Sequence, residues 1–518
     1  MNDSSILTGD ARRLRLCLWA LVALTIFRVA TLFASPLEIY PDEAQYWLWS
    51  RHLDFGYFSK PPMIAWAIAL TTTAGNAEPF VRLSAPLFHF VAALALFGAG
   101  RKLYGVWTGV AAAALYSLMP GVQQSSFIIS TDAPLLCFLS LALLAYAHVQ
   151  DAEHRLFHAL GLGAALGLAM LSKYAALYAV IGIALHLALS AGARRAWTWK
   201  TAGAAIAAFL VVLAPNLIWN AAHHFATVGH TAANANWGAG KLFNLPELFE
   251  FILSQFGVFG PIPFAVLAAG LILGLAKRRL AGPDLLLACL AAPPLLVVLV
   301  QAFISRANAN WAASAYVAGS VLAAAWLVRP KARPWLWTAV GLQGAVALAI
   351  LVGLAQPKLA DAAGLSNSLK RARGWEGLTE ALIRRADTEA ANGGVTAVAV
   401  DDRFLFNVVA YYGRDFFQSP GAPPLTIWVK GAHAGNQAEA ESPLTPALGG
   451  RVVVGSLNGG HVAEIKADFS SAETAEIASL ILSPGCKMGK TEKQAHFDHR
   501  CRRSMTLLVG EGFRPVAR

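Results

Sequence analysis

The chain has 518 residues, of which 56% are hydrophobic and only 14% charged, and its mean hydropathy is +0.51. These values exclude a single soluble domain with a polar surface and predict an α-helical protein that crosses a membrane several times. The net charge of +11 does not predict a nucleic-acid partner, because Lys and Arg fall in short clusters between apolar runs and not along one stripe.

Eleven apolar runs are long enough to cross a bilayer, so we expect about eleven transmembrane helices. Three arginines precede the first run and no small-residue cleavage site follows it, which predicts a retained helix and not a removed signal peptide. The runs cover approximately Leu16–Ala34, Phe80–Gly100, Val106–Gln123, Ala133–Val149, Leu156–Leu171, Ala175–Leu189, Ala202–Trp219, Leu248–Ala276, Leu285–Phe303, Ala312–Val328 and Trp335–Leu354.

The basic clusters between these runs predict their orientation. If the N-terminus is cytoplasmic, every cluster falls on the cytoplasmic side, as the positive-inside rule requires. The run Met63–Ala74 is too short to span, so we expect a juxtamembrane helix on the outer side. An odd number of spans then places the C-terminus on the outer side of the membrane, and we expect membrane lipids to surround the spans within residues 1–355.

The first outer loop, residues 35–79, concentrates acidic, basic and aromatic groups. Asp42 and Glu43 follow Pro41, and Lys60 precedes a Pro61-Pro62 pair. The surrounding rings, which include Tyr40 and Tyr57, are also typical of an aromatic belt at the headgroup level. An acidic pair is equally typical of the first turn of a helix, so a structural and a catalytic interpretation both remain open.

The predicted topology gathers further polar residues on the outer face. Asp132 opens the fourth span after Ser130-Thr131, where a helix cap is the simplest explanation. Arg82 and Lys173 could extend toward lipid phosphates. The histidines have no convincing metal-ligand spacing, since His223 and His224 are adjacent. The candidates for binding on this face are Arg82, Lys173, Tyr174, His230 in the large outer loop 220–246, and Arg306.

The sequence Ala-Asn-Ala-Asn-Trp occurs twice, at Ala233–Trp237 and Ala307–Trp311, both times on the predicted outer side. Asparagine supplies a donor and an acceptor together, and tryptophan supplies a flat apolar face. This chemistry suits a sugar ring, although helix capping with an interfacial tryptophan would explain it too. The sugar- or acceptor-binding candidates are Asn234, Asn236, Trp237, Asn308, Asn310 and Trp311, together with Tyr40, Tyr57, Tyr174 and His230.

From about residue 356 the long apolar runs stop, which predicts a small α/β domain outside the membrane over residues 356–518. Thr396–Val400 and Arg451–Val454 look like buried strands, and Gly374–Ala391 and Ala472–Leu482 like helices. Ser419–Gly450 looks loop-rich. In an oxidising compartment Cys486 and Cys501 could form a disulfide, or remain two free thiols.

An outward site with carboxylates, cations and sugar-compatible amides at the lipid surface suits a donor that is both phosphorylated and membrane-embedded, such as a polyprenyl-phosphate sugar. A carboxylate would take the proton of an acceptor hydroxyl, and Lys and Arg would stabilise the leaving phosphate. We assign no metal ligands and no certain cofactor. An acidic pair could hold a divalent cation.

Asp42-Glu43, Ser59-Lys60-Pro61-Pro62, Thr131-Asp132 and the eleven-helix layout resemble the membrane-embedded GT-C glycosyltransferases over about residues 15–330. The closest likeness is to the bacterial branch related to protein O-mannosyltransferases and to the aminoarabinose transferase of lipid A. That transferase often carries an acid where this chain has Ser59, which leaves the transferred sugar open.

The resemblance implies a GT-C fold and inverting transfer of a hexosyl or pentosyl group from a polyprenyl-phosphate donor. It also implies that Asp42 is the base, with Glu43 beside it, and that Lys60 contacts the donor phosphate. Asp132 is a further catalytic candidate from its place on the outer face. An envelope glycolipid of the lipopolysaccharide type is the favoured acceptor over another glycan or a protein hydroxyl. The alternatives are a transporter or flippase of a lipid-linked sugar and a non-catalytic assembly factor; a transporter would carry its charges near mid-helix.

Overall fold

The computed structural model describes residues 3–149, 154–233, 243–431, 434–482 and 502–516, with only the backbone described for residues 3–11. The chain divides into two compact units. The first contains the chain up to Phe33 together with Asp54–Val352, and the second contains Ala34–Leu53 together with Gly353–Arg518. We predict a single boundary between the two domains, at residue 355. The structure differs from this prediction in the first outer loop, because Ala34–Leu53 belongs to the second unit.

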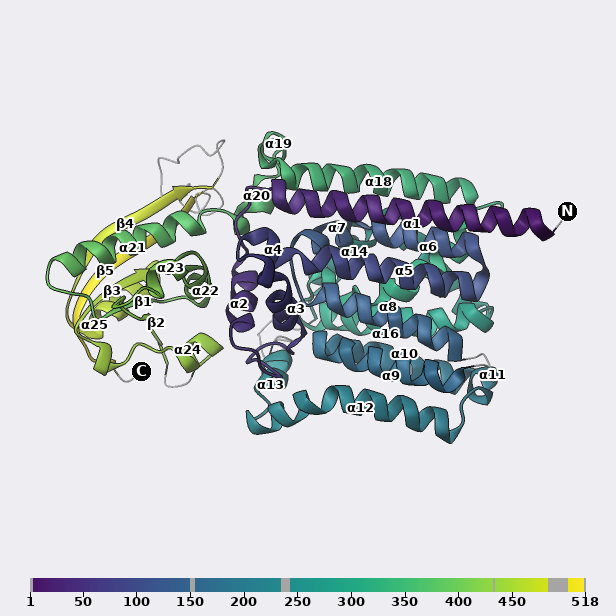
Figure 1. Cartoon of the computed structure of the whole chain (residues 1–518), viewed down its shortest axis with the longest axis horizontal. Helices are drawn as coiled ribbons and strands as arrows, with labels where there is room; N and C mark the ends of the chain where they lie inside the picture. Colours follow the sequence, from purple (N-terminus) through teal and green to yellow (C-terminus); the bar gives the residue numbers. More distant parts are fainter. Residues whose placement is uncertain (1–2, 150–153, 234–242, 432–433, 483–501, 517–518) are drawn as a thin grey trace. The chain divides into compact units, whose positions relative to one another are not determined.

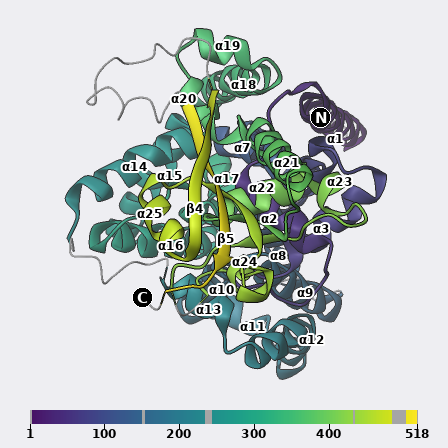
Figure 2. The ribbon, with the colours of Figure 1, turned by 90° about the vertical axis from the view of Figure 1, so that its left-hand side faces the viewer.

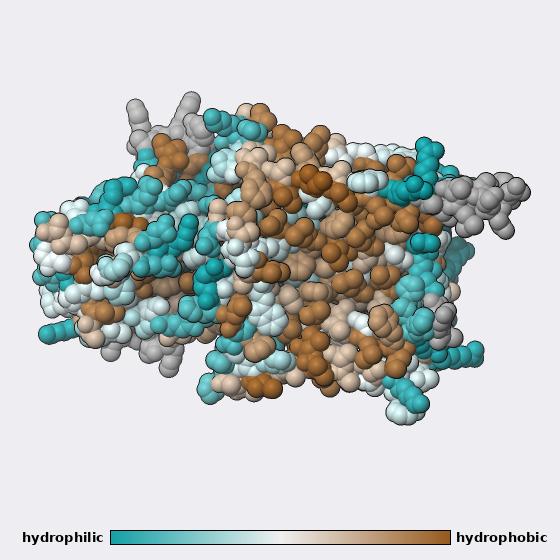
Figure 3. Space-filling view, viewed as in Figure 1, coloured by the Kyte–Doolittle hydropathy of each residue, from teal (hydrophilic) through white to brown (hydrophobic). Residues whose placement is uncertain are grey.

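The first unit is built from helices, whose long members run side by side in Figure 1. Apolar side chains cover much of the face that Figure 3 shows for these helices. The helices are α1 (Asp3–Ala34), α3 (Met63–Thr71), α4 (Glu78–Arg82), α5 (Ser84–Tyr104), α6 (Val106–Leu118), α7 (Pro120–Phe127), α8 (Asp132–Val149), α9 (Arg155–Ser172), α10 (Leu177–Leu189), α11 (Ala191–Arg195), α12 (Trp199–Ala222), α13 (Ala226–Ala233), α14 (Leu245–Phe259), α15 (Pro261–Ala276), α16 (Gly282–Ile304), α17 (Ala315–Leu327) and α18 (Arg333–Ala355).

Within the described residues, seven helices are long and apolar enough to cross a membrane. Four of the shorter apolar helices, α6, α10, α15 and α17, account for the remaining predicted spans. The chain is therefore a multi-pass membrane protein of the predicted helical class. The fifth short helix, Met63–Ala74, is the segment for which we predict an interfacial position.

Small residues let neighbouring helices approach closely. A β-carbon added to Gly163 of α9 would lie 2.0 Å from the carbonyl oxygen of Ala205 in α12, and one added to Gly167 would lie 2.8 Å from Val212. Gly163 and Gly167 are four residues apart, so they share one face of α9. Such small-residue faces are a common basis of helix packing in membranes, where van der Waals contact replaces the hydrophobic effect.

Two predicted spans are broken in the structure. Val106–Gln123 divides at Met119, which has a ψ of 128° before Pro120, and Leu248–Ala276 divides at Gly260, which has a φ of 97° before Pro261. Predicting each as one continuous helix was wrong, because proline cannot donate to the preceding turn.

Buried polar side chains from other helices bind the carbonyl groups that the breaks release. Arg28 of α1 and Gln123 donate to the carbonyl oxygen of Ser117, and Gln343 of α18 donates to that of Phe259 at 2.7 Å. In lipid these carbonyl groups have no water to bind, so such partners make the breaks tolerable.

The second unit is an α/β structure with a five-stranded sheet in the order β2-β1-β3-β5-β4. Strands β2, β1 and β3 are parallel, whereas β5 is antiparallel to both β3 and β4. The elements are α2 (Pro41–Ser50), α19 (Pro357–Ala362), α20 (Ser366–Leu369), α21 (Trp375–Ala391), β1 (Ala397–Val400), α22 (Arg403–Tyr412), α23 (Arg414–Phe417), β2 (Leu425–Ile427), α24 (Gln437–Glu441), β3 (Arg451–Ser456), α25 (Val462–Ala467), β4 (Phe469–Ile481) and β5 (Arg502–Phe513).

Figure 2 shows β4 and β5 running side by side, with β4 spanning thirteen residues. The prediction of a helix over Ala472–Leu482 was therefore wrong, since the strand partner lies far along the chain and leaves no local signal. The strands at Thr396–Val400 and Arg451–Val454 and the helix at Gly374–Ala391 correspond to β1, β3 and α21. The loop-rich stretch Ser419–Gly450 contains the short elements β2 and α24.

The segment that carries Asp42 and Glu43 is anchored within the second unit. The backbone amide of Glu38 donates to the carbonyl oxygen of Ala372 at 3.1 Å, and that of Ile39 donates to the Tyr412 hydroxyl at 2.9 Å. Trp47 of α2 packs edge-on against Tyr411 of α22, with ring centroids 5.0 Å apart. The acidic pair is thereby carried on a short helix that is packed on the α/β fold.

Candidate active site

Three of the predicted site residues meet at helix ends in the first unit. Asp132 is the first residue of α8, Lys173 ends α9 with an extended backbone (φ −162°, ψ 135°), and Asn310 lies in the 3-10 turn Ala309–Ala312. The Lys173 ammonium lies 2.7 Å from Asp132 Oδ1, and Asn310 Nδ2 donates to Asp132 Oδ2 at 2.6 Å. Each oxygen of the Asp132 carboxylate therefore already accepts a hydrogen bond. Asp132 is better suited to holding Lys173 in place than to taking a proton.

Tyr174 continues this polar cluster into α12. Its hydroxyl donates to Asn216 Oδ1 at 3.1 Å and accepts from Asn220 Nδ2 at the same distance. Asn216 in turn donates to the carbonyl oxygen of Phe55 at 2.6 Å. Our sequence analysis missed Asn216 and Asn220, although two buried amides four residues apart in an apolar run are a detectable signal.

The segment Asp54–Lys60 is fixed against the end of α12. Trp219 Nε1 donates to Asp54 Oδ2 at 2.6 Å, and the Trp219 ring covers Gly56 so closely that a β-carbon there would lie 2.3 Å from a ring carbon. The Thr227 hydroxyl donates to the carbonyl oxygen of Tyr57 at 2.6 Å. The sequence analysis also missed Asp54 and Trp219 as positioning residues.

Lys60 lies at the end of this fixed segment. Its carbonyl oxygen accepts a hydrogen bond from the Tyr57 amide at 3.1 Å, and its side chain is half-buried. Tyr57 is itself buried, and its hydroxyl accepts from the Asp54 amide at 3.1 Å. The backbone of Lys60 is therefore held by contacts that lead back to α12 and α13.

The two first-loop acids have different surroundings on the first turn of α2. Glu43 is fully buried, and its Oε2 accepts the backbone amide of Tyr40 at 2.9 Å, which is the contact of a capping residue. Asp42 is exposed at the second helical position. Of the pair, Asp42 is the carboxylate that is open to solvent.

The remaining predicted residues lie in varied surroundings. Arg82 is buried, with its guanidinium 4.8 Å from the centroid of the Phe127 ring, whereas Arg306 and Asn308 are exposed.

His230 meets the edge of Phe58 at a centroid distance of 6.1 Å, and Trp311 packs against a small apolar cluster that includes Phe251. The positions outside the described residues are Asn234, Asn236, Trp237, Cys486 and Cys501.

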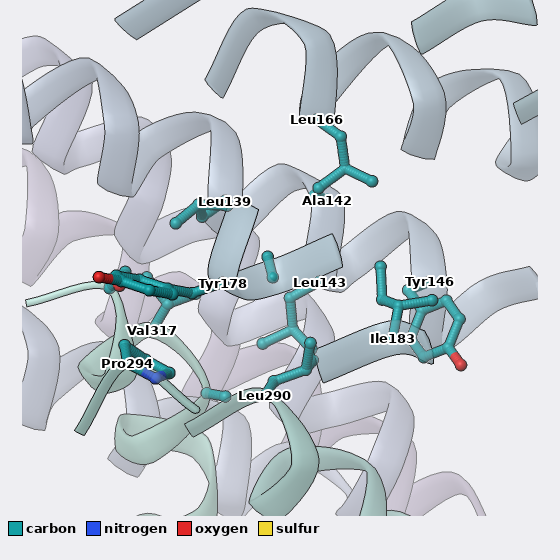
Figure 4. A pocket seen from close by; sticks show the side chains of 13 residues that line it. Leu139, Ala142, Leu143, Tyr146, Leu166, Tyr178, Ile183, Leu290, Pro294 and Val317 are labelled. Carbon is teal, nitrogen blue, oxygen red and sulfur yellow. The ribbon is translucent and has the colours of Figure 1, made fainter. Parts of the chain in front are cut away.

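A cavity inside the helical unit and the possible metal ligands can be compared with what a sugar or a metal ion needs. The cavity in Figure 4 measures about 30 Å³ and is lined mainly by apolar residues such as Leu139, Leu143 and Leu290, so it has no room for a sugar. Among the described residues, no group of three or more His, Cys, Asp or Glu could hold a metal ion.

Comparison with known proteins identifies the family. Residues 59–219, which include Lys60, Asp132, Lys173 and Asn216, match the family model described as dolichyl-phosphate-mannose-protein mannosyltransferase. The chain is 38% identical over 398 residues to a lipid A galacturonosyltransferase, RgtD, of Rhizobium johnstonii, covering 76% of this chain and 81% of that protein.

Solved structures agree on the fold. The apo crystal structure of ArnT from Cupriavidus metallidurans superposes with a TM-score of 0.63 at 15% identity, covering 96% of this chain and 98% of that one. The structure of ArnT bound to undecaprenyl phosphate gives a TM-score of 0.61 at 15% identity, over 94% of this chain and 97% of that one. The resemblance predicted from the first-loop motifs is thus confirmed: the chain belongs to the GT-C membrane glycosyltransferases, in the branch related to the protein O-mannosyltransferases and to ArnT.

Proposed function

We propose that this glycosyltransferase moves a sugar from a polyprenyl-phosphate donor to lipid A. The observation that carries the proposal is the 38% identity, over 76% of the chain, to a lipid A galacturonosyltransferase. The undecaprenyl phosphate bound by a fold relative supports the donor class. Galacturonic acid is the sugar we favour, because the relative at 38% identity is named a galacturonosyltransferase. The transporter alternative is disfavoured, since the family consists of transferases.

In the proposed reaction the acceptor hydroxyl oxygen attacks the anomeric carbon of the donor sugar. The bond between that carbon and the phosphate oxygen breaks on the opposite face, so the anomeric configuration inverts. Asp42, the exposed acid of the pair, takes the hydroxyl proton, while Glu43 holds the start of α2. The electron pair of the broken bond leaves with the polyprenyl phosphate.

Cationic side chains offset the charge that grows on the leaving phosphate. We assign Lys60 and Lys173 to this role, with Arg82 and Arg306 as further candidates. Asp132 and Tyr174 act as positioning residues: Asp132 orients Lys173 by its 2.7 Å contact, and Tyr174 joins α12 to the 54–60 segment through Asn216. The sugar and acceptor would contact exposed amides such as Asn308.

We place this chemistry on the periplasmic face of the inner membrane. The N-terminus is cytoplasmic and residues 356–518 are periplasmic in this proposal, because only that orientation keeps the basic clusters between spans inside. Glycolipid acceptors and polyprenyl-linked donors are both available on that face, whereas nucleotide sugars are not.

Mass spectrometry of lipid A tests the proposal in cells. Lipid A is compared from cells with the intact gene, a deletion, and the deletion complemented with Asp42→Asn or Asp415→Asn at matched protein level. Asp415 is a highly exposed acid and serves as the control. We expect one hexuronic-acid increment to disappear in the deletion and in Asp42→Asn but to remain in Asp415→Asn. Lipid A that is identical in all four strains would contradict the proposal.

A further inference from the structure

A cavity within the second unit is not used by the proposed chemistry. It measures about 220 Å³ and lies between the end of α2 and the helices α22 and α23. Both walls belong to the same compact unit. Its lining residues are Trp47, Leu48, Arg51, His52, Phe406, Ala410, Arg414, Phe417, Gln418 and Leu425.

Two arginines in this cavity are held by aromatic rings. The guanidinium of Arg51 lies 5.3 Å from the centroid of the Trp47 ring, and that of Arg414 lies 5.0 Å from the Tyr411 ring. Trp47 and Tyr411 pack edge-on against each other, so one aromatic pair supports both cations. Arg51 also donates to the Ser50 hydroxyl at 2.8 Å, and Arg414 to the carbonyl oxygen of Tyr411 at 2.7 Å. Because both side chains are already ordered, a ligand would lose little entropy in binding them.

The charge balance of the cavity favours an anion. None of the ten described lining residues carries a carboxylate, while two carry guanidinium groups and one an imidazole. Asp415 does not line the cavity; it is exposed and lies 3.9 Å from Arg414 Nε. Partial burial lowers the pKa of Arg51, because it removes water from around the charged guanidinium group.

The same cavity has features that suit a sugar ring. Trp47, Phe406 and Phe417 give it flat apolar walls, and Gln418 adds an amide. At about 220 Å³ the cavity has room for one sugar residue with its acidic group.

We propose that this cavity binds an acidic sugar, bearing a phosphate or a carboxylate, that belongs to the acceptor glycolipid. Arg51 and Arg414 hold the acidic group, and the aromatic walls contact the ring. The inference rests on the proposed function, because it makes the second unit a recognition module for the same acceptor. It concerns binding alone, so it can fail while the transfer reaction stands.

Ligand-observed NMR on the full chain in detergent tests the inference without turnover. The probes are galacturonate with galactose as its neutral counterpart, and glucose 1-phosphate with glucose. We expect the acidic probes to bind at least tenfold more tightly than the neutral ones. Arg51→Gln and Arg414→Gln should weaken this binding at least tenfold, whereas Arg384→Gln, an exposed arginine of α21, should not change it. Arg414→Lys keeps the positive charge but loses the paired N–H donors of the guanidinium group, so it should give an intermediate affinity. Melting temperatures equal to that of wild type would show that the variants are folded.

Competition distinguishes the sources of the acidic sugar. Lipid A should displace the acidic probes, and undecaprenyl phosphate should not. Displacement by undecaprenyl phosphate alone, or loss of binding in Lys60→Gln instead of Arg414→Gln, would show a donor site and overturn the inference. Equal binding of acidic and neutral sugars would also overturn it. If the acidic probes bind as expected while purified protein transfers no sugar to lipid A, the proposed function fails and the cavity remains an acidic-sugar site.

Discussion

Asp132, a catalytic candidate from the sequence, has contacts in the structure that suit a positioning role. The sequence placed it at a helix start beside other outer polar groups, and the structure engages both of its oxygens with Lys173 and Asn310. A carboxylate with both oxygens engaged in this way is a good anchor for a cation. Asp42, by contrast, is exposed, although it follows the same kind of sequence signal at a helix start.

A double-mutant cycle on Asp132→Asn and Lys173→Met tests the anchor at the residue scale. Each single substitution leaves the other side chain of the pair without its partner in a mostly buried position. We therefore expect each substitution to lower the free energy of unfolding by about 1–3 kcal/mol. The double variant should lose clearly less than the sum of the two singles. Denaturant unfolding in detergent measures the free energy of unfolding of the purified wild type, the two single variants and the double variant. Strictly additive losses would show that the contact does not couple these side chains.

A second residue-scale prediction concerns pH. Burial alone would raise the pKa of Asp361, but hydrogen bonds from Arg373 at 2.9 Å and Ser366 at 2.6 Å, with the guanidinium charge, lower it below its ordinary value of 3.8. A carboxyl whose folded-state pKa is lowered stabilises the fold above its unfolded-state pKa. That stabilisation disappears as the pH falls through the folded-state pKa.

Unfolding of Asp361→Asn should therefore differ most from wild type above about pH 4, and the difference should shrink as the pH is lowered further. Chemical denaturation of the full chain at a series of pH values measures this difference in the free energy of unfolding. Asp387→Asn, which removes an exposed acid on α21, serves as the control. A stability gap for Asp361→Asn that is independent of pH would contradict the assignment of Asp361 to the ion pair.

At the scale of elements, the 54–60 segment depends on the end of α12. The Trp219 ring leaves no room for a side chain at Gly56. The indole N–H of Trp219 also donates a hydrogen bond to the Asp54 carboxylate. If Lys60 binds the donor phosphate, its placement depends on this packing.

Gly56→Ala should therefore lower turnover at least tenfold and raise the KM for the donor, because the added methyl forces the segment away from α12. Adding Trp219→Ala should restore part of the activity by removing the clash. Gly161→Ala, at a glycine of α9 with open space around it, is the matched control. Wild-type kinetics in Gly56→Ala would show that the position of the segment does not matter to the reaction.

The sequence predicted the elements unevenly, for physical reasons. Long apolar runs determine membrane helices because the bilayer demands about twenty apolar residues, and all eleven predicted runs are helical in the structure. The breaks at Met119 and Gly260 escaped prediction because they need distant partners such as Arg28 and Gln343. The strand β4 escaped because its partner β5 lies across a long stretch of chain.

The candidate site, like the secondary structure, was predictable from the sequence only in part. Topology gathered Asp132, Lys173 and Asn310 on one face of the membrane, and the structure brings them into contact. What the sequence could not supply was the hydrogen-bond pattern, which decides that Asp132 and Glu43 are engaged while Asp42 is exposed. The partners of Asp54 and Asn216 could not be predicted, because Asp54 accepts from Trp219, 165 residues away along the chain, and Asn216 donates to the carbonyl oxygen of Phe55, 161 residues away.

At the scale of the whole molecule, the account requires a periplasmic second unit. Lys331 and Lys358 flank the membrane helix α18 and are both exposed, so single cysteines there report on its two ends. In a background without native cysteines, a membrane-impermeant maleimide should label Lys358→Cys in intact spheroplasts and Lys331→Cys only after permeabilisation. Labelling in the reverse pattern would contradict the orientation and remove the site from the periplasmic face.

The measurement that tests the central claim most directly is sugar transfer by the purified full chain. Reconstituted protein is given a radiolabelled polyprenyl-phosphate hexuronic acid and lipid A, and labelled lipid A is quantified for wild type, Asp42→Asn, Glu43→Gln and Asp415→Asn. We predict transfer by wild type and Asp415→Asn, and a loss of about 10²–10⁴-fold in turnover for Asp42→Asn at unchanged melting temperature. Glu43→Gln should instead lower stability with a smaller effect on turnover. Undiminished transfer by Asp42→Asn, or no transfer by folded wild type, would contradict the account.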